Sequence, residues 1–131
     1  MEERTRTLLQ ELVYARGPCG QEDEVREVCR RRLEEAGIEY WSDEAENLIA
    51  TIDGPGPPED AVQIFIHLDE ISFLIKRILA DGTVKLTTLG SFSPAFLGQI
   101  AVEILGYNGV VPGVLSLGSW HTGEETTDVW H

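Results

Sequence analysis

Three polar residues that close an apolar run, His67, Asp69 and Glu70, form the most chemically suggestive group in the sequence. A neutral imidazole binds a divalent metal through one ring nitrogen, and a carboxylate that accepts from its other N–H fixes its tautomer and orientation. Side chains two residues apart share a strand face, so extended backbone would bring His67 and Asp69 together. The spacing is compatible with a metal ligand and an orienting carboxylate, but as a motif it is weak. Taken alone, it favours a plainer interpretation: a histidine at a strand end beside two solvated acids.

The elements that must position this triplet can be predicted from the spacing of apolar residues. The run over residues 62–66 is typical of a buried strand. Upstream, apolar residues at three- and four-residue intervals predict helices over 3–15 and 21–36, separated by a Gly-Pro-Cys-Gly break. Residues 38–41 and 48–52 alternate like strands and are expected to form a hairpin.

Downstream of the triplet the helical pattern stops. Asp81-Gly82 is a strong hairpin signal between β-like segments at 71–78 and 84–89. Regularly placed glycines then divide short apolar runs, in a rhythm typical of a small barrel or sandwich. We therefore predict an αβ layer over residues 1–71 and an all-β module over residues 72–131, with the boundary near residue 72.

Composition limits the classes of function. The 131 residues suffice for one ordinary domain, and no apolar run approaches the roughly 18 residues of a membrane span. The net charge of −13, from 23 acids and 10 bases, argues against nucleic acid and anionic membrane surfaces as partners. The N-terminus lacks the pattern of a secretory signal, so a cytoplasmic location is expected. Cys19 and Cys29 are expected to be reduced, with Cys29 packed on a helix.

Motifs spread along the whole chain resemble one known family. They are Gly17-Pro18-Cys19-Gly20-Gln21-Glu22, Asn47-Leu48-Ile49-Ala50, Ile66-His67-Leu68-Asp69-Glu70 and Gly109-Val110-Val111-Pro112-Gly113. In this order they resemble the tetrahedral dinuclear-metal aminopeptidases, which include deblocking and glutamyl aminopeptidases and members described as endoglucanases. The resemblance implies an α/β fold: the N-terminal part of a mixed-sheet catalytic domain, followed by a small all-β barrel of the dimerisation type.

The resemblance also implies a chemistry. His67 matches the family's first metal ligand, and Asp69 matches the carboxylate that orients the metal site. Two divalent ions, zinc or cobalt, would activate a bridging water that attacks the N-terminal peptide bond of a peptide substrate, with a glutamate as general base. Family members pair through the inserted barrel and assemble into hollow tetrahedral dodecamers, so a homo-oligomer is expected.

The departures from the family are as informative as the match. The family's bridging aspartate, its glutamate pair, a further acidic ligand and a second histidine have no counterpart here. Glu70 is therefore not assigned as the catalytic base, and we expect the chain to be inactive without a complementing C-terminal polypeptide. Ser72 and Glu46 replace family glycines. The apolar faces of strands 48–52 and 62–67, covered in the family by the absent half, are expected to be exposed here and to drive self-association.

Other interpretations stay open. The chain could be a non-catalytic oligomerisation or interaction module derived from this family. An unrelated αβ hydrolase is a weaker reading, since neither a Gly-x-Ser-x-Gly elbow nor a phosphate loop occurs. His121 could reach a neighbouring subunit's active site or lie in a solvated loop. Four aromatic residues fit either an oligomer interface or, for the two phenylalanines, a barrel core: Phe92, Phe96, Trp120 and Trp130.

Overall fold

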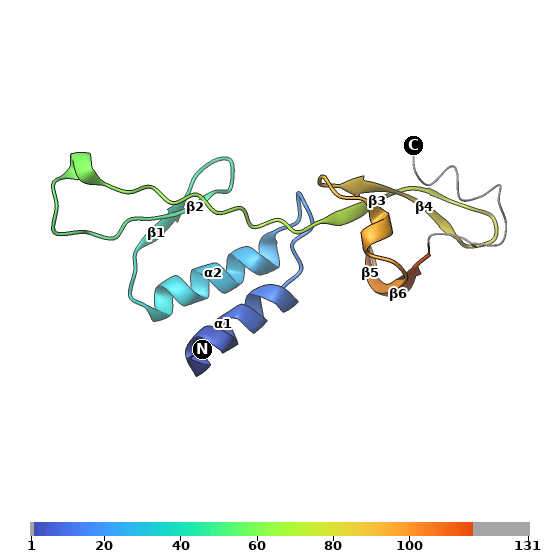
Figure 1. Cartoon of the computed structure of the whole chain (residues 1–131), viewed down its shortest axis with the longest axis horizontal. Helices are drawn as coiled ribbons and strands as arrows, with labels where there is room; N and C mark the ends of the chain where they lie inside the picture. Colours follow the sequence, from blue (N-terminus) through green and yellow to red (C-terminus); the bar gives the residue numbers. More distant parts are fainter. Residues whose placement is uncertain (1, 117–131) are drawn as a thin grey trace. The chain divides into compact units, whose positions relative to one another are not determined.

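The computed structural model describes residues 2–116, which form two helices followed by three antiparallel hairpins (Figure 1). The chain divides into two compact units, one ending at Gly90 and the other beginning at Ser91. The elements in chain order are α1 (Glu3–Tyr14), α2 (Asp23–Glu35), β1 (Tyr40–Ser42), β2 (Leu48–Ala50), the short 3-10 turn η1 (Pro58–Asp60), β3 (Ser72–Ile78), β4 (Val84–Leu89), η2 (Pro94–Phe96), β5 (Ile100–Gly106) and β6 (Gly109–Leu115).

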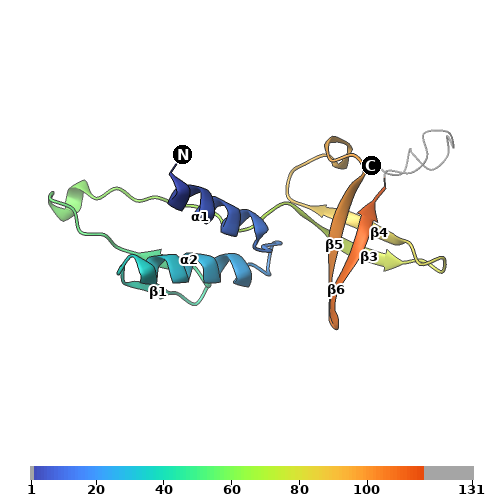
Figure 2. The ribbon, with the colours of Figure 1, turned by 90° about the horizontal axis from the view of Figure 1, so that it is seen from below.

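The two predicted helices are confirmed, and they lie side by side in opposite directions (Figures 1 and 2). Only part of the apolar stripe of α1 is covered, since Leu9 and Val13 remain 51% and 68% exposed. The helices are also joined by charge: Glu11 of α1 accepts hydrogen bonds from Arg31 and Arg32 of α2. The basic run of α2 therefore serves as a link between helices.

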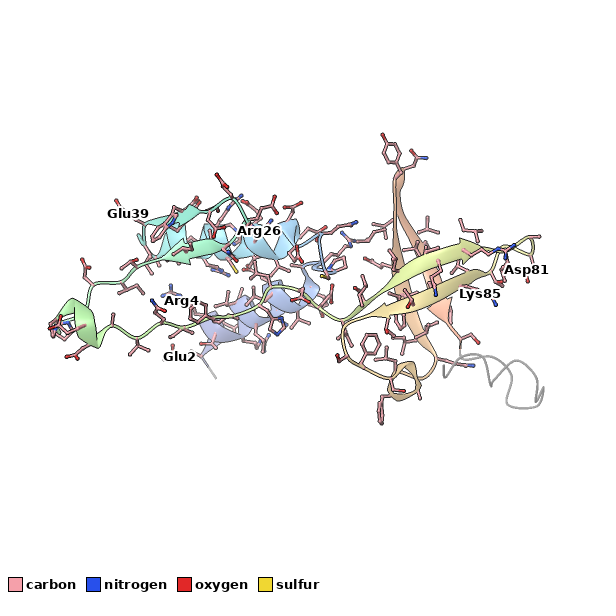
Figure 3. The ribbon with its side chains drawn as sticks, turned by 90° about the horizontal axis from the view of Figure 1, so that it is seen from above. Glu2, Arg4, Arg26, Glu39, Asp81 and Lys85 are labelled. Carbon is pink, nitrogen blue, oxygen red and sulfur yellow. The ribbon has the colours of Figure 1, made fainter. Side chains whose placement is uncertain are left out.

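Two of the three hairpins, β1–β2 and β3–β4, were predicted as hairpins, and the third, β5–β6, forms from the glycine-divided apolar runs that follow them. β1 pairs with β2, β3 with β4 and β5 with β6, each pair antiparallel. Asp81 at the tip of the β3–β4 hairpin accepts from the backbone and hydroxyl of Thr83, as expected for an Asp-Gly turn (Figure 3). In the second unit, β5 and β6 turn through residues 107–108, and Gly109 takes a φ of 126° that only glycine adopts freely.

Little of the described chain is buried. The buried hydrophobic residues are Val25 and Leu115, each 7% exposed. Many large apolar side chains lie open instead, because a two-stranded sheet has no second layer to cover its face. Within residues 2–116, each unit taken by itself therefore buries few hydrophobic side chains.

The buried strand predicted over residues 62–66 is wrong for this structure. The backbone from 61 to 69 pairs with no strand among the described residues, and Val62 and Phe65 are 85% and 88% exposed. A strand is maintained by a neighbouring strand, which this segment lacks here. The expectation that the apolar faces of 48–52 and 62–67 are exposed is confirmed in part: Ile52 and Ile66 are 75% and 79% exposed, whereas Leu48 and Ile49 are half-buried.

The α/β character of the chain is confirmed at the level of two helices and three small antiparallel sheets. The three sheets are separate in the part that the structure describes, and the division at residue 72 stays a prediction. Neither helix within residues 2–116 is long and apolar enough to cross a membrane.

Candidate functional site

The predicted pairing of His67 with Asp69 is present, although the backbone there is not a paired strand. His67 Nδ1 lies 3.2 Å from Asp69 Oδ1 and 3.0 Å from the Asp69 carbonyl oxygen. Both partners are acceptors, so Nδ1 must carry the ring proton and donate it. The side chain of His67 is 83% exposed, which leaves Nε2, with its lone pair, facing solvent. This tautomer and this exposure suit a histidine that binds a metal through Nε2.

Glu70 has a role that the sequence did not indicate. Its backbone N–H donates to the Gly17 carbonyl oxygen at 2.7 Å, and its Oε1 accepts from the Gly17 N–H at 2.9 Å. An isolated parallel bridge also joins Pro18 to Glu70. The carboxylate is therefore engaged in holding two distant segments together.

Gly17 makes that contact possible because it has no side chain. A Cβ at Gly17 would lie 2.8 Å from Val25 Cγ2 and 3.1 Å from the Leu68 carbonyl oxygen, both too close for a comfortable contact. Val25 is one of the few buried hydrophobic residues. The turn between α1 and α2 is thus pressed against both the start of α2 and the backbone beside His67.

The loop before Asn47 is held by a carboxylate. Asp43 Oδ1 accepts from the backbone N–H groups of Ala45 and Asn47, and Asp43 Oδ2 accepts from Asn47 Nδ2. The hydrogen bonds from Asn47, with those from the backbone, hold the pKa of Asp43 below its ordinary value. Glu46 adopts the left-handed φ of 63° that favours glycine.

Arg26 links α2 to this loop. Although it is only 7% exposed, its side chain has acceptors: Nη1 donates to Asp23 Oδ1 at 2.7 Å, and Nε donates to the Glu46 carbonyl oxygen at 3.2 Å. The Glu46 carboxylate lies 3.3 Å from Arg26 Nη2. Burial of this arginine is tolerated because its donors find acceptors on both sides.

The residues present fit one ligand position of a metal site. Within residues 2–116, no group of three or more His, Cys, Asp or Glu side chains lies close enough to hold a metal ion. His67, with Asp69 as its partner, remains the candidate for one ligand position. His121, Trp120 and Trp130 lie outside the described residues, and of the two phenylalanines, Phe96 is 91% exposed while Phe92 is half-buried.

Comparison with known proteins identifies a class of metallopeptidase. A family model described as M42 glutamyl aminopeptidase matches residues 46–129. This is more than half of the sequence, and the chain belongs to that family, which confirms the resemblance predicted from the order of the motifs.

Two curated relatives come from Escherichia coli (strain K12). The chain is 26% identical to the "Putative aminopeptidase SgcX" over 110 residues and 31% identical to the "Putative aminopeptidase FrvX" over 109 residues. Each match covers 82% of this chain and 30% of the relative, so the chain spans less than a third of the length of these proteins. No solved structure was found to match the chain.

Sequence patterns missed two contacts at this site. The bonds between Gly17 and Glu70 join positions 53 residues apart, and no local spacing reveals such a pair. No sequence pattern singled out Arg26. For Gly17 and Glu70, the available signal was that both stand inside motifs that resemble the family.

Proposed function

We propose that this chain is the N-terminal portion of a metal-dependent aminopeptidase, which removes N-terminal residues from peptides, and that it is inactive alone. The observation that carries the proposal is the His67–Asp69 pair, placed within the segment that the M42 family model matches. In this function His67 Nε2 is one ligand of a zinc or cobalt ion, and Asp69 holds the ring in the required tautomer. A second ion and the remaining ligands belong to the complete site.

The incomplete ligand set supports inactivity of the isolated chain. A catalytic divalent ion needs several protein ligands, and residues 2–116 bring together only His67 and its partner. The chain also spans 30% of the relatives it matches. We propose that a complementing C-terminal polypeptide supplies the missing carboxylates, the second histidine and the general base, and that the whole is a cytoplasmic homo-oligomer.

The fold proposed for the complete protein follows the same logic. We propose that residues 1–71 complete a mixed sheet with the complementing polypeptide, and that residues 72–131 form part of a small barrel through which subunits pair. The exposed apolar side chains at 62–66 support the first part. The three antiparallel hairpins are compatible building blocks for the second.

The proposal is tested by a peptidase assay with aminoacyl p-nitroanilides and added zinc or cobalt. The isolated chain is expected to give no turnover. Turnover is expected when the C-terminal two thirds of an M42 polypeptide is supplied, and His67→Ala should abolish it. Glu39→Ala, at an exposed acid on the same unit, is the matched control and should leave it unchanged (Figure 3).

Each outcome of this assay decides a separate point. Robust turnover by the isolated chain would show that the account of missing ligands is wrong. Turnover of the reconstituted pair that survives His67→Ala would remove His67 from the ligand set. A pair that associates but never turns over would favour a non-catalytic function.

A second candidate function is a stand-alone interaction module that keeps the barrel-like hairpins and lacks catalysis. It is favoured by the apolar side chains that both units expose, such as Phe65 at 88% and Val114 at 74%. Light scattering and zinc calorimetry separate the two. A dimer or larger assembly that takes up no zinc supports the module, whereas a strict monomer that binds zinc contradicts it.

A further inference from the structure

The contact between Glu70 and Gly17 is the first hydrogen-bonded anchor that the chain meets after the loop at 53–60. From 61 to 69 the backbone has no ladder partner among the described residues. At Glu70 it is fixed twice, by a backbone bond of 2.7 Å to the Gly17 carbonyl and by a carboxylate bond of 2.9 Å from the Gly17 N–H. The candidate ligand His67 therefore lies only three residues before this fixed point.

Leu68, the residue between His67 and Asp69, is also restricted, because its backbone lies against Gly17 in the turn between α1 and α2. The Leu68 carbonyl oxygen faces the Gly17 Cα so closely that even a methyl group would lie 3.1 Å away. Leu68 and Asp69 are half-buried, whereas His67 on their N-terminal side is exposed. The contacts with Gly17 thus fix the backbone of residues 68–70, which includes Asp69. The exposed His67 ring then forms its hydrogen bond with Asp69.

We propose that Glu70 is a positioning residue: through its two hydrogen bonds to Gly17 it fixes residues 68–70, so that Asp69 stays within hydrogen-bonding distance of His67 Nδ1. The use of the resulting free Nε2 as a metal ligand rests on the function proposed above. The ordering of the pair itself does not, because it concerns contacts present in the metal-free chain.

A carboxylate suits this role better than a neutral side chain. Its oxygen accepts from the Gly17 N–H, and the backbone N–H of Glu70 donates to the Gly17 carbonyl oxygen. Together the two hydrogen bonds close a ring between the two residues, which resists rotation of the Glu70 backbone. Glutamine can still accept through its side-chain oxygen. Alanine cannot, and aspartate is one methylene too short to keep the same geometry.

The experiment measures the tautomer of His67 by long-range proton–nitrogen spectra of the metal-free chain at about pH 9, where imidazole is neutral. In the parent chain the Nδ1–H form is expected to dominate. Glu70→Ala should lower the ratio of Nδ1–H to Nε2–H by roughly two- to tenfold, as for the loss of one ordinary hydrogen bond. Amide exchange of Gly17 should accelerate by a similar factor.

Further variants make the result specific. Asp69→Ala removes the acceptor side chain but keeps the backbone carbonyl of residue 69, which lies 3.0 Å from Nδ1, so it sets the size of the side-chain contribution to the tautomer ratio. Glu70→Gln should restore most of the parent ratio. Glu59→Ala, at an exposed acid in the preceding loop, should change neither the ratio nor the exchange of Gly17. If Glu70→Ala loses its helical circular dichroism, Glu70→Asp gives the same comparison.

The positioning role is overturned if Glu70→Ala keeps the parent tautomer ratio, whether or not Gly17 exchanges faster, because the acid would then merely anchor the turn between the helices. That result would leave the aminopeptidase proposal intact, since no metal or substrate enters the measurement. Conversely, a shifted ratio in a chain whose reconstituted form never hydrolyses peptides would uphold the positioning role and contradict the proposed function.

Discussion

Glu46 is bound to Arg26 through two different atoms: its carbonyl oxygen accepts from Arg26 Nε at 3.2 Å, and its carboxylate lies 3.3 Å from Nη2. The contact joins α2 to the β1–β2 loop. It is made by a residue whose φ of 63° is unfavourable for any side chain with a Cβ. Glu46 therefore combines a favourable ion pair with Arg26 and an unfavourable left-handed backbone conformation.

Replacing that residue with glycine tests which effect is larger. Glu46→Gly should stabilise the chain by up to about 1 kcal/mol, since the left-handed conformation costs about that much and an exposed carboxylate contributes little. Arg26 keeps the carbonyl oxygen of residue 46 and the Asp23 carboxylate. Urea unfolding followed by circular dichroism measures the change, with Glu44→Gly in the same loop as control. A less stable Glu46→Gly would show that the ion pair outweighs the strain.

Adding one methyl group at Gly17 should be costly. Gly17→Ala is expected to lower the free energy of unfolding by about 1–3 kcal/mol, because Val25 and the Leu68 carbonyl must both move. Gly54→Ala is the control, since its added Cβ meets nothing within 4 Å. Thermal unfolding of the two variants gives the comparison. Equal stability of both would mean that the α1–α2 turn can shift freely.

Removing the hydroxyl of Ser72 should be favourable. Its Oγ is buried and has no hydrogen-bond partner among the described residues, and a polar atom in that state costs about 1–3 kcal/mol. Ser72→Ala should therefore raise the unfolding free energy by about 1 kcal/mol in urea titrations. Ser42→Ala, at an exposed strand position, should change it little. A destabilised Ser72→Ala would indicate that the hydroxyl does bind a partner.

The contact between the helices should weaken in acid. A hydrogen bond from Arg31, with a second from Arg32 and the charges of both, keeps the pKa of Glu11 below its ordinary value despite some desolvation. A lowered folded-state pKa stabilises the chain above the ordinary glutamate value of about 4.3, and that stability is lost as the pH falls further. Glu11→Gln should flatten this part of the pH–stability curve, and Glu39→Gln should not. Parallel curves for the parent and Glu11→Gln would contradict this link.

The two cysteines should differ in reactivity. Burial raises the pKa of the Cys29 thiol, which lowers its thiolate fraction, whereas Cys19 is exposed in the α1–α2 turn. Iodoacetamide at neutral pH should label Cys19 well before Cys29, as followed by mass spectrometry of peptides. In urea the two rates should converge. Faster labelling of Cys29 in the folded chain would show that α2 opens readily.

Local patterns were sufficient for the helices and the hairpins of this protein, although they also predicted a strand over residues 62–66 that is not formed. The helices, the hairpins and the Asp81-Gly82 turn all depend on residues close in sequence, so periodicity and turn chemistry determine them. The pairing of His67 with Asp69 is also local, since only Leu68 lies between them. It formed without the strand geometry from which it was predicted, because the side chains reach each other within one turn of chain.

The sequence by itself determined the family, the helices, the hairpins and the one candidate ligand with its carboxylate. The tertiary structure alone decided that residues 62–66 remain unpaired and exposed, that Arg26 is buried between α2 and a strained loop residue, and that Glu70 is bonded to Gly17. These features depend on which distant groups come together and on which partners are missing. The spacing of residues along the chain predicts neither the contacts between distant groups nor the missing partners.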